Sequence, residues 1–317
     1  MANESHPSTL MEAIRYFSRP GVALDYLAKL RWPHGPVCEK CGLTGEDLIF
    51  LKNAQRWKCR GCKNQFSVKR GSIMEDSPLS LDKWLCAIWM IANCKNGVSS
   101  YEISRTLGIT QKSAWFMLHR IRLAMEHKSL EKMSGPVEVD ESYFGGKITN
   151  MSKEKRKRKG TKGRGTIGKA VVMGILERGG HVRATVVPDT KAKTLIPAIC
   201  ENVKDGARVF TDSHGSYVDL RGRFDHEAVN HLMEEYVRGE VHTNGIENFW
   251  ALLKRGLDGT YVNVEPFHLF RYLDEQVFRY NKRKDNDAGR FKSLIAKLAG
   301  KRLTYAALTG GMEPQTC

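Results

Sequence analysis

The feature that most restricts how this chain can fold is a set of four cysteines in two close pairs. Cys38 and Cys41 lie in the stretch CEKC, and Cys59 and Cys62 lie in CRGC, with 17 residues between the two stretches. A CxxC stretch places both sulfurs on one tight turn, and two such turns complete a tetrahedron of thiolates around an ion. Redox-active dithiols are the alternative, but they usually occur singly in a thioredoxin-like setting that this sequence lacks. We therefore predict a structural Zn²⁺ ion in a zinc ribbon, with no coordination position left for water.

The charge of the chain favours a polyanionic partner. Lys and Arg total 51 against 35 Asp and Glu, which gives a net charge of +16 over 317 residues. Such an excess is typical of proteins that bind nucleic acid, and a generally basic surface is the alternative. No apolar run is long enough to cross a bilayer, and the N-terminus lacks a secretory signal. We therefore expect a cytoplasmic protein without a membrane partner.

Hydrophobic periodicity and turn residues divide the chain into five segments, which predict a multidomain α+β protein. The α/β segment contains β-like runs such as PVEVD and ARVFTD and a basic loop over residues 150–168. The predicted segments are a helical stretch over 1–33, the zinc ribbon over 34–72, a helical domain over 73–132, an α/β domain with a mixed sheet over 133–283, and a helical tail over 284–317.

The segment SSYEISRTLGITQKSAWFMLHRIR predicts a helix-turn-helix. Ser99 and Glu102 form a capping box for a first helix, Gly108 allows the turn, and Thr110 caps a second helix. The first turn of that second helix would enter the major groove of DNA. A plain helical hairpin is the alternative. The candidate DNA contacts in this turn are Gln111, Lys112 and Ser113.

A strongly basic segment, KEKRKRKGTKGRG, lies inside the predicted α/β domain. It has eight basic residues and no large apolar side chain, so it cannot pack a core and predicts a loop. Arg156, Lys157 and Arg158 are candidate contacts to the DNA backbone. A solvated connection without a ligand is an equally good interpretation.

Three carboxylates are candidates for a catalytic metal site. Asp140 ends the run PVEVD, Asp212 ends ARVFTD, and Glu247 lies in the first turn of the helix NGIENFWALLKRGL. Three such carboxylates can hold two Mg²⁺ or Mn²⁺ ions about 3.5–4 Å apart, the arrangement used for in-line phosphoryl displacement. The alternative is a capping box between Asn244 and Glu247. Lys254 lies two turns after Glu247 on the same helix face, where it could contact a phosphate.

These motifs together resemble one protein family. The stretches CEKC with CRGC, FSVKRGSIM, VDESYFGGK, TDSHGSY and HTNGIENFWALLKRGL are similar to a zinc-ribbon branch of bacterial DDE transposases related to Merlin elements. The resemblance runs from about residue 20 to about residue 283 and implies a ribonuclease-H-like catalytic domain. Asp140, Asp212 and Glu247 match the acidic triad. In this branch the third acid is sometimes replaced by Asn or His, so Asn244 is a fallback ligand.

The resemblance also implies a mechanism and partners. The ribbon and helix-turn-helix would bind the terminal inverted repeats of an insertion sequence, and two-metal-ion cleavage would release a 3′-hydroxyl that then attacks target DNA. Asp140 would bridge both ions, and Asp212 and Glu247 would each hold one. His214 and His242 are near the triad in sequence, but we leave both out of it. We expect a homodimer or higher multimer on DNA, associated with the bacterial nucleoid.

Three other functions are compatible with parts of the sequence. A reused, non-catalytic DNA-binding regulator would be expected to have lost at least one carboxylate, and all three are present. A nuclease of the same fold would cleave DNA without joining strands, and the sequence does not exclude it. A zinc-ribbon partner of the transcription machinery would not need the carboxylate half of the chain.

Overall fold

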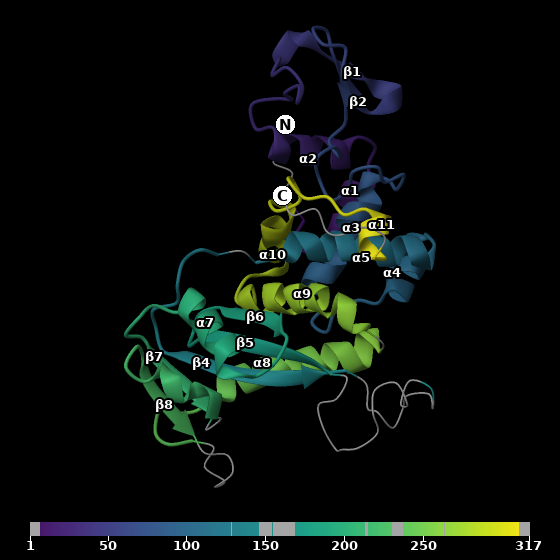
Figure 1. Ribbon diagram of the computed structural model, residues 1–317. Helices are drawn as coiled ribbons and strands as arrows, with labels where there is room; N and C mark the ends of the chain where they lie inside the picture. Colours follow the sequence, from purple (N-terminus) through teal and green to yellow (C-terminus); the bar gives the residue numbers. More distant parts are fainter. Residues whose placement is uncertain are drawn as a thin grey trace. The chain divides into compact units, whose positions relative to one another are not determined.

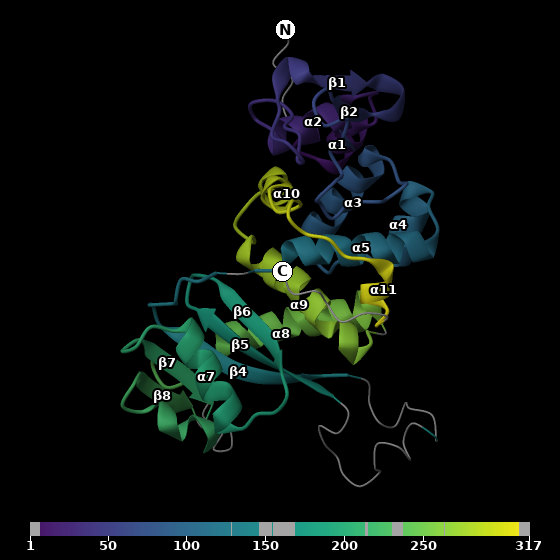
Figure 2. The same cartoon turned by 45° about the horizontal axis from the view of Figure 1, so that its top comes forward.

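The computed structural model describes residues 7–127, 129–145, 154, 169–212, 215–229, 237–262 and 264–310. The chain forms two compact units (Figures 1 and 2). One comprises Met1–Met125 together with Asp285–Cys317, and the other comprises Glu126–Lys284. Most of the basic loop predicted over 150–168, with Arg156, Lys157 and Arg158, lies outside the described residues, as does His214.

The first unit combines a small sheet with helices from both ends of the chain. Its three strands pair antiparallel in the order β1-β2-β3. The strands are β1 (Leu48–Leu51), β2 (Arg56–Cys59) and β3 (Gln65–Phe66). The helices are α1 (Leu10–Phe17), α2 (Val22–Arg31), the 3₁₀ turns η1 (Gly45–Asp47) and η2 (Lys52–Ala54), α3 (Leu81–Asn93), α4 (Ser100–Leu107), α5 (Gln111–Met125), α10 (Asp287–Ile295) and α11 (Tyr305–Leu308).

The core of this unit forms around α3, which is apolar on nearly every side and is therefore surrounded by other helices. Phe291 of α10 packs against Trp89 of α3 and Phe17 of α1, with ring centroids 4.9 and 5.8 Å apart. The C-terminal segment, which the sequence predicted as a separate helical tail, is therefore part of the hydrophobic core of the N-terminal unit.

Helices α4 and α5 begin and turn as the local sequence predicts. The Ser99–Glu102 capping box is present, with the Ser99 N–H donating to Glu102 Oε2 at 2.7 Å. Gly108 ends α4 with φ = 59°, a left-handed conformation that glycine adopts at low cost. Thr110 caps α5 by accepting a hydrogen bond from the Ser113 N–H at 3.2 Å. Two helices are thus joined by a short turn, α4 ending at Leu107 and α5 beginning at Gln111.

The second unit is built on a mixed five-stranded sheet, as predicted, with the order β6-β5-β4-β7-β8. Strand β4 pairs antiparallel with β5 and parallel with β7, β5 pairs antiparallel with β6, and β7 pairs parallel with β8. The elements are β4 (Val137–Phe144), β5 (Ala170–Glu177), β6 (Val182–Val187), α7 (Ala192–Asn202), β7 (Arg208–Asp212), η4 (Gly215–Leu220), β8 (Asp225–Val229), α8 (Asn244–Arg255), the π-helical turn η6 (Gly256–Tyr261), η7 (Pro266–His268) and α9 (Leu269–Asn281).

Helices cover both faces of this sheet (Figures 1 and 2). Val137 and Val139 of β4 point into a core shared with α7 and η4, whereas Val172 and Leu176 of β5 join a second core with α8 and α9. Because successive side chains of a strand alternate between faces, Glu138 and Asp140 lie on the α8 side of β4. The alternation of β4 therefore directs two carboxylates towards α8.

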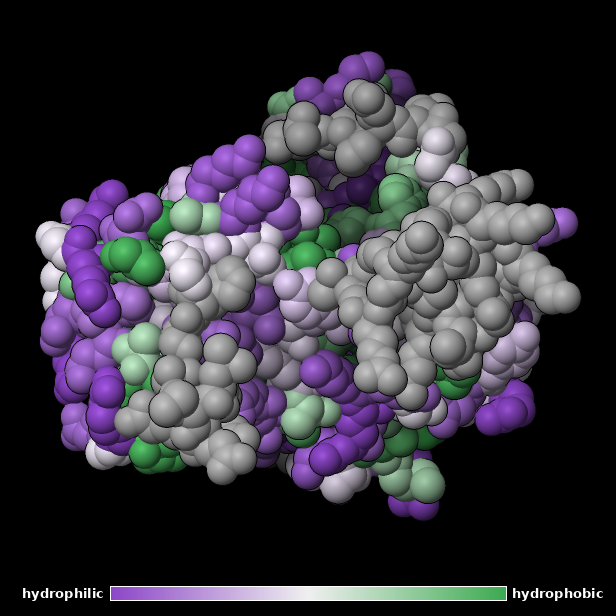
Figure 3. Space-filling model, turned by 60° about the horizontal axis from the view of Figure 1, so that its bottom comes forward, coloured by the Kyte–Doolittle hydropathy of each residue, from purple (hydrophilic) through white to green (hydrophobic). Residues whose placement is uncertain are grey.

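Hydrophilic side chains cover much of the face drawn in Figure 3. On the face shown in Figure 3, hydrophilic side chains surround small groups of hydrophobic ones. None of the helices in the described part of the chain combines the length and apolarity that a membrane span requires.

Candidate functional site

The four cysteines of the ribbon lie together as the spacing predicts. Cys38 Sγ is 3.5 Å from Cys62 Sγ, and Cys41 Sγ is 3.5 Å from Cys59 Sγ. Their four sulfurs all lie within 4.8 Å of one another. Tetrahedral zinc with Zn–S bonds of about 2.3 Å separates its sulfurs by roughly 3.8 Å. The thiolates therefore fit Zn²⁺ in number, chemistry and spacing.

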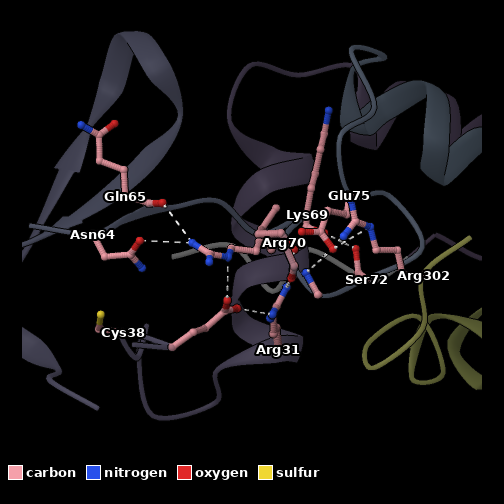
Figure 4. A network of polar contacts seen from close by, with 12 residues as sticks. Arg31, Cys38, Asn64, Gln65, Lys69, Arg70, Ser72, Glu75 and Arg302 are labelled. Carbon is pink, nitrogen blue, oxygen red and sulfur yellow. Dashed lines mark hydrogen bonds and ion pairs between the residues drawn. The ribbon is translucent and has the colours of Figure 1, made fainter. Parts of the chain in front are cut away.

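An ionic network connects the first cysteine turn to its surroundings (Figure 4). Glu39, inside the CEKC turn, accepts from Arg31 Nη2 at 2.5 Å and lies 3.3 Å from Arg70 Nε. Arg31, the last residue of α2, also donates to the Val68 carbonyl at 2.8 Å. The same side chains thus fix the cysteine turn against α2 and against the chain that follows β3.

The two aspartates lie on neighbouring parallel strands. Asp140 is in β4 and Asp212 is the last residue of β7. Their parallel pairing ends at Glu138 with Phe210, and each of these residues lies two positions before an aspartate. The pKa of Asp140 is raised to about 6, first by burial and then by the negative charges of Asp212 and Glu247. Three carboxylates that are far apart in sequence therefore interact electrostatically in the folded chain.

Glu247 is presented by the first turns of α8. The helix begins at Asn244, and Thr243 is its N-terminal flanking residue. The Thr243 hydroxyl donates to Glu247 Oε1 at 2.8 Å. The alternative of an Asn244–Glu247 capping box is wrong, because Asn244 is itself the first helical residue. Glu247 and Asn244 are both exposed to solvent.

Trp250 joins α8 to the aspartate of β4. Its indole Nε1 donates to Asp140 Oδ2 at 2.9 Å, which opposes the rise in the pKa of Asp140. A Cβ atom on Gly174, the residue paired with Asp140 on β5, would lie only 2.7 Å from Trp250 Cζ2 and Ile246 Cδ1. The sequence analysis missed Trp250, although its position three residues after Glu247 places both on one helix face.

Glu141 is a fourth carboxylate near the pair, and the sequence analysis missed it as well. It lies on the opposite face of β4 and accepts a hydrogen bond from the Tyr217 hydroxyl. The pKa of Glu141 is raised to about 7, mainly by burial; the Tyr217 hydrogen bond opposes this rise, and the charges of Asp140 and Asp212 add to it. Its place next to Asp140 in the stretch VDESYF was the only sequence signal.

The carboxylates are more widely spaced than the thiolates. Within the described residues, the cysteines are the one group of three or more His, Cys, Asp or Glu side chains whose ligand atoms all lie within 4.8 Å of one another. Asp140, Asp212 and Glu247 offer hard oxygen ligands, which fit Mg²⁺ or Mn²⁺ in type.

The predicted DNA-contacting residues already have partners within the protein. Gln111 Nε2 donates to Ser100 Oγ at 2.9 Å, and Lys112 Nζ lies 4.7 Å from the centroid of the Tyr305 ring. The Ser113 hydroxyl accepts from Thr110 at 2.9 Å. In the other unit, Lys254 is exposed on α8 and its Nζ is 5.9 Å from the Phe144 ring centroid.

Comparison with known families defines the class of the protein. A transposase zinc-ribbon domain matches residues 21–65, and an ISXO2-like transposase domain matches residues 132–281. The first domain covers the cysteine ribbon and the second covers the mixed α/β unit. Both matching models describe transposase domains. The chain belongs to the IS1595 family of DDE transposases. The family resemblance seen in the sequence motifs is therefore confirmed.

Curated relatives agree with this assignment. An uncharacterized protein in the transposable element ISH50 of Halobacterium salinarum is 26% identical over 258 residues, which cover 78% of this chain and 86% of the relative. An uncharacterized transposase-like protein of Haemophilus influenzae is 36% identical over 101 residues, covering 32% of this chain and 80% of that relative. No significant match was found among solved structures.

Proposed function

We propose that the chain is an active transposase that hydrolyses phosphodiester bonds at the ends of an insertion sequence and joins the resulting 3′-hydroxyl ends to target DNA. The observation that supports this most is the electrostatic interaction of Asp140 with Asp212 and Glu247, which come from two strands and a helix. The proposal includes a ribonuclease-H-like assignment for the α/β unit, and the mixed order β6-β5-β4-β7-β8 is compatible with it.

The three carboxylates would share the work of binding two Mg²⁺ or Mn²⁺ ions. Two such ions, when bound, stabilise both the attacking and the leaving oxygen of an in-line displacement. Asp140 would contribute to both ions because it interacts with both of the other acids, and Asp212 and Glu247 would each hold one. Trp250 would orient the Asp140 carboxylate through its indole N–H. The negative charges that raise the pKa of Asp140 are those that divalent cations would neutralise.

Binding of DNA would use the basic residues of both units. We assign α4 and α5 to a DNA-binding helix-turn-helix, in which Gln111, Lys112 and Ser113 exchange their present partners for DNA, and Lys254 to a phosphate near the carboxylates. The ribbon and the net charge of +16 support this assignment. Pairing of two element ends would require a dimer or a higher multimer, acting on DNA at the bacterial nucleoid.

A strand-transfer assay separates this function from its alternatives. Purified full-length protein is incubated with Mg²⁺, a target plasmid and a pre-cut inverted-repeat end that carries a 3′-hydroxyl. Joining of that end to the plasmid supports the proposal, and its loss in Asp140→Asn assigns the reaction to this site. Cleavage of an uncut end without joining would indicate a nuclease, and DNA binding alone would indicate a regulator.

Comparison of Glu247→Gln with Asn244→Ala tests the identity of the third ligand. If Glu247 holds an ion, Glu247→Gln abolishes joining and Asn244→Ala retains it. The opposite result would assign the ligand to Asn244.

A further inference from the structure

An ionic network formed by Glu138 and Arg178 lies next to Asp140 on β4. Glu138, two residues before Asp140 on β4, has only 1% of its side chain exposed. Its Oε2 accepts from the backbone N–H of Ile246 at 2.9 Å, and its Oε1 accepts from Arg178 Nε at 2.8 Å. Both oxygens of one carboxylate are therefore occupied, one by α8 and one by a guanidinium.

Arg178 contacts all three chain segments that carry the acids. It binds Glu138 of β4, and its guanidinium carbon lies 4.2 Å from the ring centroid of Phe210, two residues before Asp212 on β7. It also donates to the carbonyls of Glu240 and His242, at 2.7 and 2.9 Å, just before α8. One side chain thus connects the segments that precede Asp140, Asp212 and Glu247.

The spacing of the contacts fixes one turn of α8 on β4. Glu138 binds Ile246, and Asp140 binds Trp250. Two residues along a strand span about 6.6 Å, and four residues along a helix rise about 6 Å, so the two contacts match in length. Glu247 lies within the turn that these contacts hold.

Close approach of the helix depends on a glycine. A Cβ atom on Gly245 would lie 2.7 Å from Glu138 Oε2 and 2.6 Å from Leu176 Cδ2. Only a residue without a side chain allows the start of α8 to lie directly on the Glu138 carboxylate.

We infer that Glu138 and Arg178 are positioning residues, which hold the first turn of α8 so that Glu247 reaches the ions bound by Asp140 and Asp212. This inference rests on the proposed function of the carboxylates. Neither residue would touch DNA or take part in chemistry. Removal of their contacts should change how tightly the site binds divalent ions, because supporting groups orient the ligands themselves.

The test compares Glu138→Gln with a matched control. Gln keeps the shape of Glu but offers one acceptor oxygen and one NH₂ group, so it cannot accept from both Ile246 and Arg178. The control is Glu275→Gln, which removes another fully buried carboxylate, the partner of Arg279 within α9. Each full-length variant is measured for Mg²⁺ dependence of end cleavage, for affinity towards inverted-repeat DNA, for thermal stability and for hydrogen exchange of the Ile246 amide.

We expect Glu138→Gln to raise the Mg²⁺ concentration for half-maximal cleavage about 10–100-fold, to speed exchange at Ile246 and to leave DNA affinity unchanged. Glu275→Gln should lower stability without changing the Mg²⁺ requirement. If Glu138→Gln does not fold, Arg178→Lys tests the inference instead. Lysine keeps the positive charge but lacks the planar guanidinium group, so this variant should also raise the Mg²⁺ requirement.

Two results would overturn the inference: a wild-type Mg²⁺ requirement with unchanged Ile246 exchange in the folded variant, or an equal rise in the Mg²⁺ requirement in Glu275→Gln. If wild-type protein does not cleave DNA at all, the proposed function fails. The exchange measurement still decides whether Glu138 holds α8, because it needs no catalysis.

Discussion

Replacement of Gly174 by alanine tests how closely α8 must approach the sheet. The new methyl group would lie 2.7 Å from Ile246 Cδ1 and from Trp250 Cζ2, and 2.8 Å from Trp250 Cη2. Ordinary carbon contacts need about 3.5–4.0 Å, so the helix must move by roughly 1 Å or its side chains must leave their rotamers. Overpacking of this kind costs about 1–3 kcal/mol, partly offset by the 0.5–1 kcal/mol that alanine typically gains over glycine.

The expected loss of activity is larger than the loss of stability. A net cost of about 1–2 kcal/mol lowers the melting temperature by roughly 2–8 °C and leaves the protein folded. A displacement of about 1 Å between ligands can reduce a reaction rate about 100-fold. We therefore expect Gly174→Ala to melt cooperatively at a slightly lower temperature and to cleave inverted-repeat DNA about 100-fold more slowly with saturating Mg²⁺.

Gly259→Ala is the matched control, because a Cβ atom there meets no atom within 4 Å. It should keep the cleavage rate of the wild type. If Gly174→Ala cleaves DNA at the wild-type rate while its melting temperature falls, the contact between α8 and the sheet does not position the acids, and our reasoning is refuted.

Four further predictions concern zinc, the pH dependence of Mg²⁺ binding and of stability, and the indole hydrogen bond. Cys59→Ser should lose the zinc ion of the ribbon, measured by metal analysis, and weaken binding to inverted-repeat DNA; retention of zinc would count against a four-thiolate site. Because the pKa of Asp140 is raised to about 6, protons should compete with Mg²⁺ below that pH, so the half-saturating Mg²⁺ concentration should rise as pH falls from 7 to 5 and stay level above 7. The raised pKa of Asp140 also means that the metal-free folded state binds more protons than the unfolded state between about pH 4 and 6. The contribution of Asp140 to the free energy of unfolding should therefore fall as the pH rises through this range, and urea denaturation measures that change. Trp250→Phe should raise the Mg²⁺ requirement roughly 10–150-fold, because it removes a hydrogen bond to a charged group that is worth about 1.5–3 kcal/mol. An unchanged Mg²⁺ titration would exclude that role.

Local sequence patterns predicted the parts of the site that local geometry decides. The CxxC spacing brings Cys38 and Cys41 onto one turn in any fold, and the Ser99–Glu102 capping box needs only one helix turn. Asp140 and Asp212 were proposed as ligands because each closes a β-like run in the sequence. Asp212 is the last residue of β7, but Asp140 lies inside β4, which continues to Phe144.

Tertiary contacts explain what the sequence did not reveal. Asn244 and Glu247 have the spacing of a capping box, but α8 already begins at Asn244. The first turn of α8 also contacts Glu138, 108 residues away in sequence, through the Ile246 N–H, and no local pattern predicts this contact. No spacing rule links Glu138 to Arg178 or Trp250 to Asp140. The packing of Phe291 into the N-terminal core requires the chain to return from the second unit to the first, which no local pattern predicts.

A structure of the full-length protein with inverted-repeat DNA and Mn²⁺ tests the central claim most directly, because anomalous scattering locates each ion. We predict two Mn²⁺ ions about 3.5–4 Å apart at the scissile phosphate, with Asp140 bound to both ions, Asp212 to one and Glu247 to the other. A structure in which these ions bind elsewhere, or in which Glu247 stays on the Thr243 hydroxyl while DNA is bound, would contradict the account.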